Sequence, residues 1–349
     1  MKRQFSYYVS GNTADGYVNF IESNLKGIAQ IYVLHHPSSY IKTELLQSFL
    51  QTQAEDDVEV LLSPLGEEYL DGVINRKKSV AVIIAEISGP ILSQATLINL
   101  EDDIPTSEEG KHDLQSLQYQ FNKRMQEAYE QFATGLKIHD KLEGIFIGEM
   151  DFAKADEIAE QFIHDLLKDE EKKEKQSQQY HRLFGTNTKE GAVNIVPTLL
   201  KDLKKSYFIK GRAGTGKSTF MKKVLAACED YGFDLELYHC SFDPNSIDMV
   251  LVRELGFCIF DSTDPHEFFP SRKGEETIDM YKETVKDGTD EKYAEEIAAV
   301  TKEYKSHMKQ GIAKIKEADI YVQQINEKFT LSENEMNQLS ESVLQKINK

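Results

Sequence analysis

One stretch of the chain, Gly211–Thr219, has residue types and spacing suited to holding phosphate groups. Its sequence, Gly-Arg-Ala-Gly-Thr-Gly-Lys-Ser-Thr, fits the pattern G-x-x-x-x-G-K-[ST] at every position. Glycines let the backbone take positive φ angles and come close to phosphate oxygens. Lys217 would reach the β- and γ-phosphates of a nucleoside triphosphate, and the Ser218 hydroxyl would bind Mg²⁺. We expect the whole stretch to contact nucleotide: Gly211, Arg212, Ala213, Gly214, Thr215, Gly216, Lys217, Ser218 and Thr219.

The flanking residues predict the elements that such a loop requires. Tyr207–Ile209 is a short apolar run typical of a buried strand, and Phe220–Ala227 has the apolar spacing of a helix. A strand, a glycine-rich turn and a helix N-terminus together form an anion cradle, because N–H groups and the helix dipole point at the ligand. A chance turn between a strand and a helix is the alternative, and the full match in this setting disfavours it.

A second candidate for the same site is Asp261, at the end of the apolar run Gly256–Asp261. A buried strand that ends in an acid downstream of a phosphate loop is typical of a Walker B strand, whose carboxylate holds Mg²⁺ through water. We therefore predict Lys217 and Asp261 as catalytic residues, with Ser218 and Asp261 at the metal. Asp243 follows the alternating run 235–240, and His266 and Glu267 follow Asp261. All three are candidates to orient water or an acceptor, or else to cap loops.

The chain also contains an internal repeat. A shift of 175 residues lays 12–46 over 187–221 with nine identities in 35 positions, where chance gives about two. Farther on, a shift of 177 aligns three more residues. The identical pairs are Asn12/Asn187, Thr13/Thr188, Gly16/Gly191, Val18/Val193, Asn19/Asn194, Leu25/Leu200, Lys26/Lys201, Tyr32/Tyr207 and Lys42/Lys217, then Asp71/Asp248, Val73/Val250 and Arg76/Arg253. The repeat predicts tandem duplication of one α/β unit.

The first copy has lost the glycines of the loop. His36, Ser39 and Ile41 stand where the second copy has glycine, although Lys42 and Thr43 persist. Because β-branched residues resist positive φ, we expect this copy to bind nucleotide weakly or not at all. The adjacent His35 and His36 do not predict a metal site, since neighbouring strand residues point to opposite faces.

These features predict a domain plan. Residues 1–170 would form a degenerate phosphate-loop domain with a helical appendage, 171–182 a charged linker, and 183–349 the nucleotide-binding domain with a helical tail. Apolar residues at helical spacing in 111–142 and in 290–349 predict long helices that pack across both domains, or that contact another molecule. The expected class is α/β, with two tandem domains built on mainly parallel sheets.

Composition narrows the classes of function. The net charge of −18 disfavours general binding to nucleic acid or to anionic membranes. No apolar run approaches the roughly 20 residues of a membrane span, and the start lacks the apolar core of a secretory signal. Three unpaired cysteines, Cys228, Cys240 and Cys258, are typical of reduced thiols. We therefore expect a cytoplasmic protein.

Several segments together resemble one family. They are Ile209–Ser218, Tyr238–Asn245, Arg253–Gly256 and Asp261–His266. The chain is similar over essentially its full length to a bacterial family of tandem-duplicated P-loop ATPase-like proteins, within the P-loop NTPase superfamily. The resemblance implies ATP binding and hydrolysis and names no physiological role. The N-terminal copy of that family can carry a phosphate loop of its own, and the present first copy departs from it.

The sequence thus predicts an ATP-binding protein, with Mg²⁺-dependent ATPase activity at one working site in the second copy. ATP and Mg²⁺ are the expected cofactors, with a protein partner or self-association through the helices. Two alternatives stay open. A small-molecule or nucleotide kinase would bind its acceptor near 243–248 and 264–270, although Arg272 is the only arginine between 255 and 290. A switch or scaffold would bind ATP without turnover. As a further hypothesis, Lys42 or Arg76 of the first copy would complete the second site.

Overall fold

The structure is a computed structural model that describes residues 3–105 and 107–348. The chain ends of the predicted domains, Met1 and Lys349, lie outside the described residues. The strands are β1 (Gln4–Tyr8), β2 (Ser10–Thr13), β3 (Gly16–Asn19), β4 (Gln30–His35), β5 (Val58–Leu62), β6 (Leu70–Asn75), β7 (Val80–Ile84), β8 (Thr96–Asn99), β9 (Gln179–Leu183), β10 (Gly185–Thr188), β11 (Gly191–Asn194), β12 (Lys205–Lys210), β13 (Leu235–His239), β14 (Ile247–Val252), β15 (Phe257–Asp261) and β16 (Glu275–Asp279).

Helices account for most of the remaining chain. They are α1 (Ile21–Asn24), α2 (Ser39–Thr52), α3 (Ala85–Ser88), α4 (Glu108–Ile147), α5 (Phe152–Leu167), α6 (Val196–Leu200), α7 (Lys217–Asp230), α8 (Met280–Thr284), α9 (Thr289–Lys292), α10 (Ala294–Glu327) and α11 (Glu333–Ile347), with short 3₁₀ turns at Gly89–Gln94 and Leu100–Asp102. The α/β class predicted from the sequence is confirmed.

One twelve-stranded sheet of the described residues runs through both copies, in the order β16-β12-β15-β14-β13-β9-β1-β5-β6-β7-β4-β8. We call the strands β1–β8 the first half and β9–β16 the second half. The order reads the same from either edge once β1 is matched with β9, β5 with β13, β6 with β14, β7 with β15, β4 with β12 and β8 with β16. The internal repeat of the sequence is therefore also a repeat of topology.

Strand directions are mixed within this sheet. Among the described strands, six of the eleven pairings between neighbours are parallel. Five are antiparallel, including the single bridge Tyr8↔Leu183 that joins the halves. Strands β6 and β14 run antiparallel to the strands on both sides of them. Each therefore begins at the edge of the sheet where its neighbours end. They consequently bring residues from their first positions to the carboxyl ends of β7 and β15.

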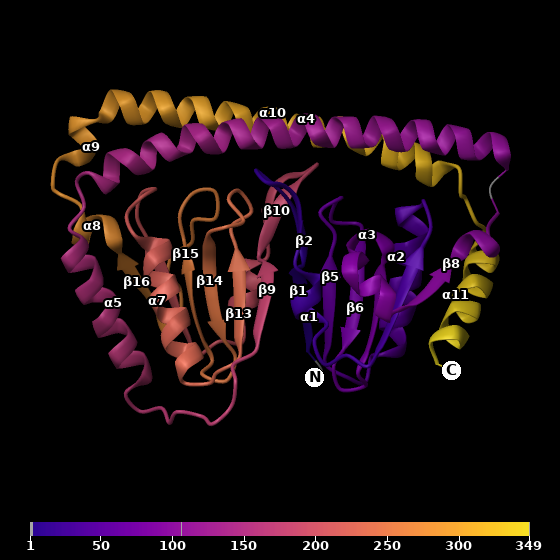
Figure 1. Cartoon of the computed structure of the whole chain (residues 1–349), viewed down its shortest axis with the longest axis horizontal. Helices are drawn as coiled ribbons and strands as arrows, with labels where there is room; N and C mark the ends of the chain where they lie inside the picture. Colours follow the sequence, from indigo (N-terminus) through magenta and orange to yellow (C-terminus); the bar gives the residue numbers. More distant parts are fainter. Residues whose placement is uncertain (1–2, 106, 349) are drawn as a thin grey trace.

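The two long helices cross from one half to the other. In Figure 1, α4 and α10 lie side by side above both halves and run in opposite directions. With 40 residues, α4 spans about 60 Å, enough to reach from the end of the first half to the far side of the second. Small residues allow the close approach, since a Cβ on Gly311 of α10 would stand 2.3 Å from the Phe132 ring of α4. The predicted packing of both helices across the two units is confirmed.

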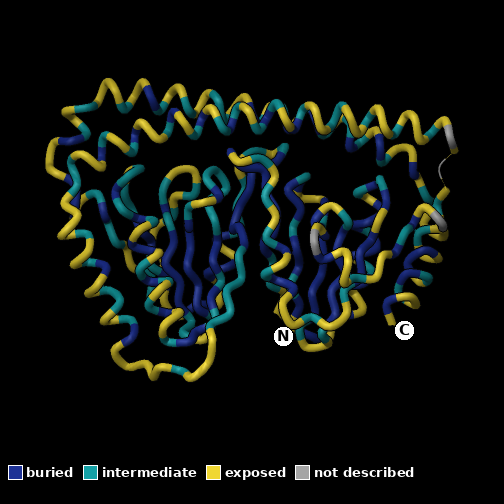
Figure 2. The backbone as a smooth tube through the Cα atoms, in the orientation of Figure 1, coloured by how far each residue is buried: buried dark blue, intermediate teal, exposed yellow. Residues whose placement is uncertain are grey.

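The shorter helices at the ends of this pair complete the opposite half's core. Ala159 and Leu167 of α5, which follows the first half in sequence, pack with Phe220 and Val224 of α7 in the second half. Leu339, Val343 and Ile347 of α11, at the end of the chain, pack into the core of the first half. Figure 2 shows the buried strands beneath helices whose outer faces are exposed. Each half thus has its sheet covered by a helix from the other copy.

Some smaller features of the chain are also defined by the structure. The apolar run Met249–Val252 belongs to strand β14. Cys228, Cys240 and Cys258 are free thiols, as expected. Within the described residues, no helix is long and apolar enough to cross a bilayer, and no group of His, Cys, Asp and Glu is arranged to hold a metal ion.

Candidate functional site

The loop 211–216 connects the end of β12 to the first residue of α7, Lys217. Three of its glycines have positive φ: 156° at Gly211, 76° at Gly214 and 78° at Gly216. Residues with a Cβ rarely adopt these angles, so the glycines fix the path of the loop. The Thr215 hydroxyl donates to the carbonyl of Arg212 over 2.8 Å and closes the turn from inside. A strand, a loop with positive-φ glycines and a helix therefore follow one another here, in the order that the sequence predicts.

The amine of Lys217 lies inside this cradle. The residue is only 9% exposed. Its Nζ donates to the carbonyl oxygen of Arg212 at 2.7 Å and lies 3.6 Å from Oδ2 of Asp261. Asp261 is the last residue of β15, which pairs with β12 in parallel, so both groups sit at the same edge of the sheet. The other carboxylate oxygen, Oδ1, accepts from the Thr263 hydroxyl at 2.6 Å. The loop, Lys217 and Asp261 are brought together.

A buried acid beside this pair was not singled out as a site residue from the sequence. Asp248, near the start of β14, lies across from Asp261, because Met249 pairs with Phe260 in the antiparallel register. Burial, followed by the charge of Asp261, raises the pKa of Asp248. The signal that could have found it is its recurrence as Asp71, where burial likewise raises the pKa, to about 7.

The other loop candidates have local roles. The imidazole of His266 lies edge-on to Phe184 and has Nε2 3.9 Å from Oδ2 of Asp248. Burial lowers the pKa of His266. Glu267 forms an ion pair with Lys210 at 3.1 Å, and the Asp243 carboxylate accepts from the backbone N–H of Asn245 at 3.0 Å. Of these candidates, His266 lies beside Asp248, and Asp243 is near enough for its charge to add to the raised pKa of Asp248.

The C-terminal part of α4 and the residues just after it cover the outside of the loop. A Cβ on Gly214 would stand 2.5 Å from the carbonyl oxygen of Glu143, and one on Gly216 would stand 2.7 Å from Cε of Met150. Ala213 packs against the cluster that Ile138 and Leu142 of α4 form with Val300 of α10. No local sequence pattern predicts these contacts, because they come from a helix more than 60 residues upstream.

Two titratable side chains of this covering segment face the site. Burial raises the pKa of Glu143, with Asp140 and Asp243 adding to the effect and Lys217 opposing it. Burial lowers the pKa of His139, and Lys217 adds to this while nearby acids, including Asp261, oppose it. The charges of Lys217 and the acids of the site therefore act on the pKa values of these two side chains of α4.

At its rim, the loop is joined to helix α9 by an ion pair. Arg212 is more than half exposed and places Nη2 2.5 Å from Oδ2 of Asp290 in α9. Its guanidinium also lies 5.8 Å from the centre of the Tyr281 ring in α8. Thr219 is exposed in the first turn of α7, next to Ser218. Arg212 is thus held away from the interior of the cradle.

The first half repeats the lysine and acid without the glycines. Lys42, 1% exposed, forms an ion pair with Glu86, as Lys217 does with Asp261. The Thr43 hydroxyl accepts from the backbone N–H of Leu70 at 3.1 Å. In place of α4, the end of α10 covers this loop: Oδ1 of Asn326 accepts from the Ser38 hydroxyl at 2.8 Å and from the Tyr40 N–H at 3.2 Å. The side-chain amide oxygen of Asn326 thereby accepts hydrogen bonds from two donors of the first-half loop.

The sequence hypothesis that Lys42 or Arg76 completes the second site does not agree with their positions. Lys42 is held by Glu86 in its own half. Arg76 donates a hydrogen bond to Glu59. Its guanidinium lines a cavity of about 300 Å³, together with Arg182 and Arg253, at the end of the strands opposite to Asp261. Arg253 follows β14, whose last residue pairs with Phe257, the first residue of β15. Arg76 is thus separated from Asp261 by the length of a strand, about 13 Å or more.

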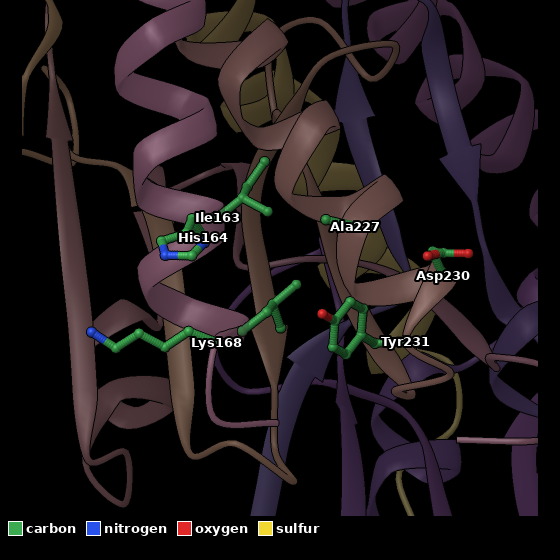
Figure 3. A pocket seen from close by; sticks show the side chains of 7 residues that line it. Ile163, His164, Lys168, Ala227, Asp230 and Tyr231 are labelled. Carbon is green, nitrogen blue, oxygen red and sulfur yellow. The ribbon is translucent and has the colours of Figure 1, made fainter. Parts of the chain in front are cut away.

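A separate small pocket of about 160 Å³ lies between α5 and α7 (Figure 3). It is lined by Ile163 and His164 of α5 and by Ala227 of α7. In Figure 3 the Ile163 side chain points toward α7, whereas the Lys168 side chain, just after α5, points away from it. Because the loop is at the other end of α7, the pocket lies about 15 Å or more from Lys217. It is a gap in the packing of α5 against α7 and does not belong to the site.

Comparison of the chain with protein-family models, with curated proteins and with solved structures gave no match.

Proposed function

We propose that the second half binds ATP with Mg²⁺ at the 211–219 loop and hydrolyses it. One observation carries the proposal: a buried lysine, Lys217, begins the helix after a loop with three positive-φ glycines, and its amine lies 3.6 Å from an acid at the end of the neighbouring parallel strand. An amine satisfied only by a loop carbonyl and a carboxylate can exchange these partners for phosphate oxygens.

The residues present fit the proposed ligands. The main-chain N–H groups of the loop and the start of the 14-residue helix α7 would bind phosphate oxygens. Ser218 and Asp261 offer the oxygen ligands that Mg²⁺ prefers, with water and phosphate completing its shell. The ion would neutralise charge on the phosphates. Lys217 would stabilise the charge on the β- and γ-oxygens.

The first half is proposed to bind nucleotide weakly or not at all. Ile41 occupies the place of Gly216 in sequence and lies buried in helix α2. The donors of Ser38 and Tyr40 are taken by Asn326. A phosphate group would have to displace that side chain and would find no glycine loop around it.

The proposal is tested by phosphate release from Mg·ATP by the full chain and by Lys217→Met. Methionine fills the space of the buried side chain without its charge, so the fold is retained. Turnover that disappears in Lys217→Met and in the absence of Mg²⁺ supports the proposal. Turnover that survives the substitution contradicts it.

An ATP-dependent switch is a second candidate, favoured by the contact of α4 with the loop. Such a protein would bind Mg·ATP at the same residues and change shape without turnover. Binding abolished by Lys217→Met together with no phosphate release would select the switch over the ATPase.

A further inference from the structure

The segment of α4 that covers the loop occupies space that a bound nucleotide needs. If phosphates lie in the cradle, the sugar and base must extend past its rim. The main chain at Glu143 lies against that rim at Gly214, where a Cβ would stand 2.5 Å from the Glu143 carbonyl oxygen. The segment 138–148 and a nucleotide therefore compete for the same side of the loop.

The contacts that hold this segment down are mainly apolar. Ile138 and Leu142 pack with Val300, and Ile145, Ile297 and Tyr304 border the same cluster. Nδ1 of His139 is buried and has no hydrogen-bond partner among the described residues. A buried polar atom without a partner disfavours this arrangement relative to one in which water reaches it.

The residues that follow the segment are anchored more firmly. Met150 pairs with Val285 in an isolated bridge, and the Asp151 N–H donates to the Thr284 carbonyl at 2.7 Å. The end of α10 over the first half is likewise held by hydrogen bonds, from Ser38 and Tyr40 to Asn326. The end of the covering part of α4 is thus held by backbone hydrogen bonds and by the buried Phe146, which lies edge-on to Tyr281, whereas the part before Gly144 is held by apolar packing.

A glycine lies in the body of this segment without a packing reason. A Cβ on Gly144 would meet no atom within 4 Å, so the fold does not require glycine there. Glycine inside a helix weakens it by about 1 kcal/mol relative to alanine. Gly144 therefore lowers the cost of a bend in α4 at this position.

We propose that residues 138–148 of α4 are a lid on the 211–219 loop, which bends at Gly144 and must lift for ATP to bind. The lid is held shut by the apolar cluster of Ile138, Leu142 and Val300. The inference rests on the proposed nucleotide site and adds its regulation. Whatever shifts α4 along α10 would change the affinity of the site, since the two helices are packed along their length.

The test measures Mg·ATP affinity of the full chain by calorimetry in two variants with opposite expected effects. Leu142→Ser loosens the closed lid, and we expect about tenfold tighter apparent binding, because the competent state is more populated. Gly144→Ala stiffens the helix, and we expect about fivefold weaker binding. Ser116→Ala, on an exposed position of α4 far from the loop, is the matched control for helix strengthening and should change nothing.

The outcomes separate the lid from the site. Opposite shifts in the two variants, with Ser116→Ala like wild type, support the lid. Binding by wild type that Lys217→Met abolishes but neither lid variant alters in the expected direction overturns the lid and leaves the site. No binding by wild type or by Leu142→Ser overturns both. Circular dichroism of each sample checks that the helices are retained, and Gly144→Ala tests the lid even where Leu142→Ser is unstable.

Discussion

Asn12 and Asn187, equivalent residues of the two copies, exchange hydrogen bonds across the junction of the halves. Nδ2 of Asn12 donates to the carbonyl of Asn187 at 2.8 Å, and Nδ2 of Asn187 donates to the carbonyl of Asn12 at 2.9 Å. Both residues are almost fully buried. Their conservation between the copies is therefore explained by contact between the copies, and needs no role in ligand binding.

Removal of either amide should destabilise the junction. We expect Asn12→Ala and Asn187→Ala each to lower the free energy of unfolding by about 1–3 kcal/mol, because a buried carbonyl loses its donor. The double variant should cost less than the sum, since the two share partners. Urea unfolding checks this, with the exposed Asn122→Ala as control. Additive losses, or losses no greater than that of the control, would contradict the role assigned to the pair.

Arg182 links acids from both halves and should be a larger contributor. Its guanidinium lies 2.9 Å from Glu236 and 3.6 Å from Glu59, and stacks over the ring of Tyr7. Arg182→Met would leave buried carboxylates without this partner, and we expect a loss of about 3–5 kcal/mol. Arg3→Met, which removes a pair with the exposed Asp57, should cost about 0–1 kcal/mol. Equal effects in the two variants would refute the assignment.

The same cluster predicts the response to acid. Burial tends to raise the pKa of Glu236, but Arg182 and Arg253 together lower it to about 2. Because the folded state binds this proton less readily than the unfolded state, the stabilisation is present above about pH 4.3 and is lost as the pH falls towards 2. Arg182→Met should therefore show a smaller loss across that interval in thermal unfolding. A parallel curve for variant and wild type would count against it.

Asp71 predicts the opposite trend at higher pH. Burial raises its pKa to about 7, although hydrogen bonds from Ser63 and Ser10 oppose this. The folded state keeps the proton while the unfolded state releases it near pH 3.9, so stability declines as the pH rises from about 4 to 7, by up to about 1.4 kcal/mol per unit. Asp71→Asn should reduce this slope without abolishing it, because burial also raises the pKa of Asp248. The exposed Asp169→Asn should leave the slope unchanged. A slope in Asp71→Asn equal to that of wild type would exclude this carboxyl as a source.

Local features of the site could be predicted from the sequence because each depends on a short run of residues. The glycines fix positive φ at three positions, and the apolar run before Asp261 predicts the strand β15 that carries it. The repeat predicted equivalent copies, and the identical strand order of the two halves agrees with it.

The packing of α5 against the second half and of α11 against the first half could not be predicted in this way. The stripe of Leu114, Leu117 and Phe121 on α4 indicates an apolar face but not which surface covers it. The direction of β14 was also open, since Met249–Val252 is apolar throughout and buried strands of either direction share that pattern. Asp248 was consequently not placed beside Asp261, nor Glu143 beside Gly214, because both depend on pairings distant in sequence.

The most direct test of the account is the number of nucleotides bound by each chain. Calorimetric titration with Mg·ATP should give one site in wild type, one in Lys42→Met and none in Lys217→Met. The two substitutions are matched, because both lysines are buried and pair with an acid: Asp261 at the end of β15, and Glu86 just after the equivalent strand β7. Two sites in wild type, or binding lost in Lys42→Met and kept in Lys217→Met, would show that the working loop has been assigned to the wrong half.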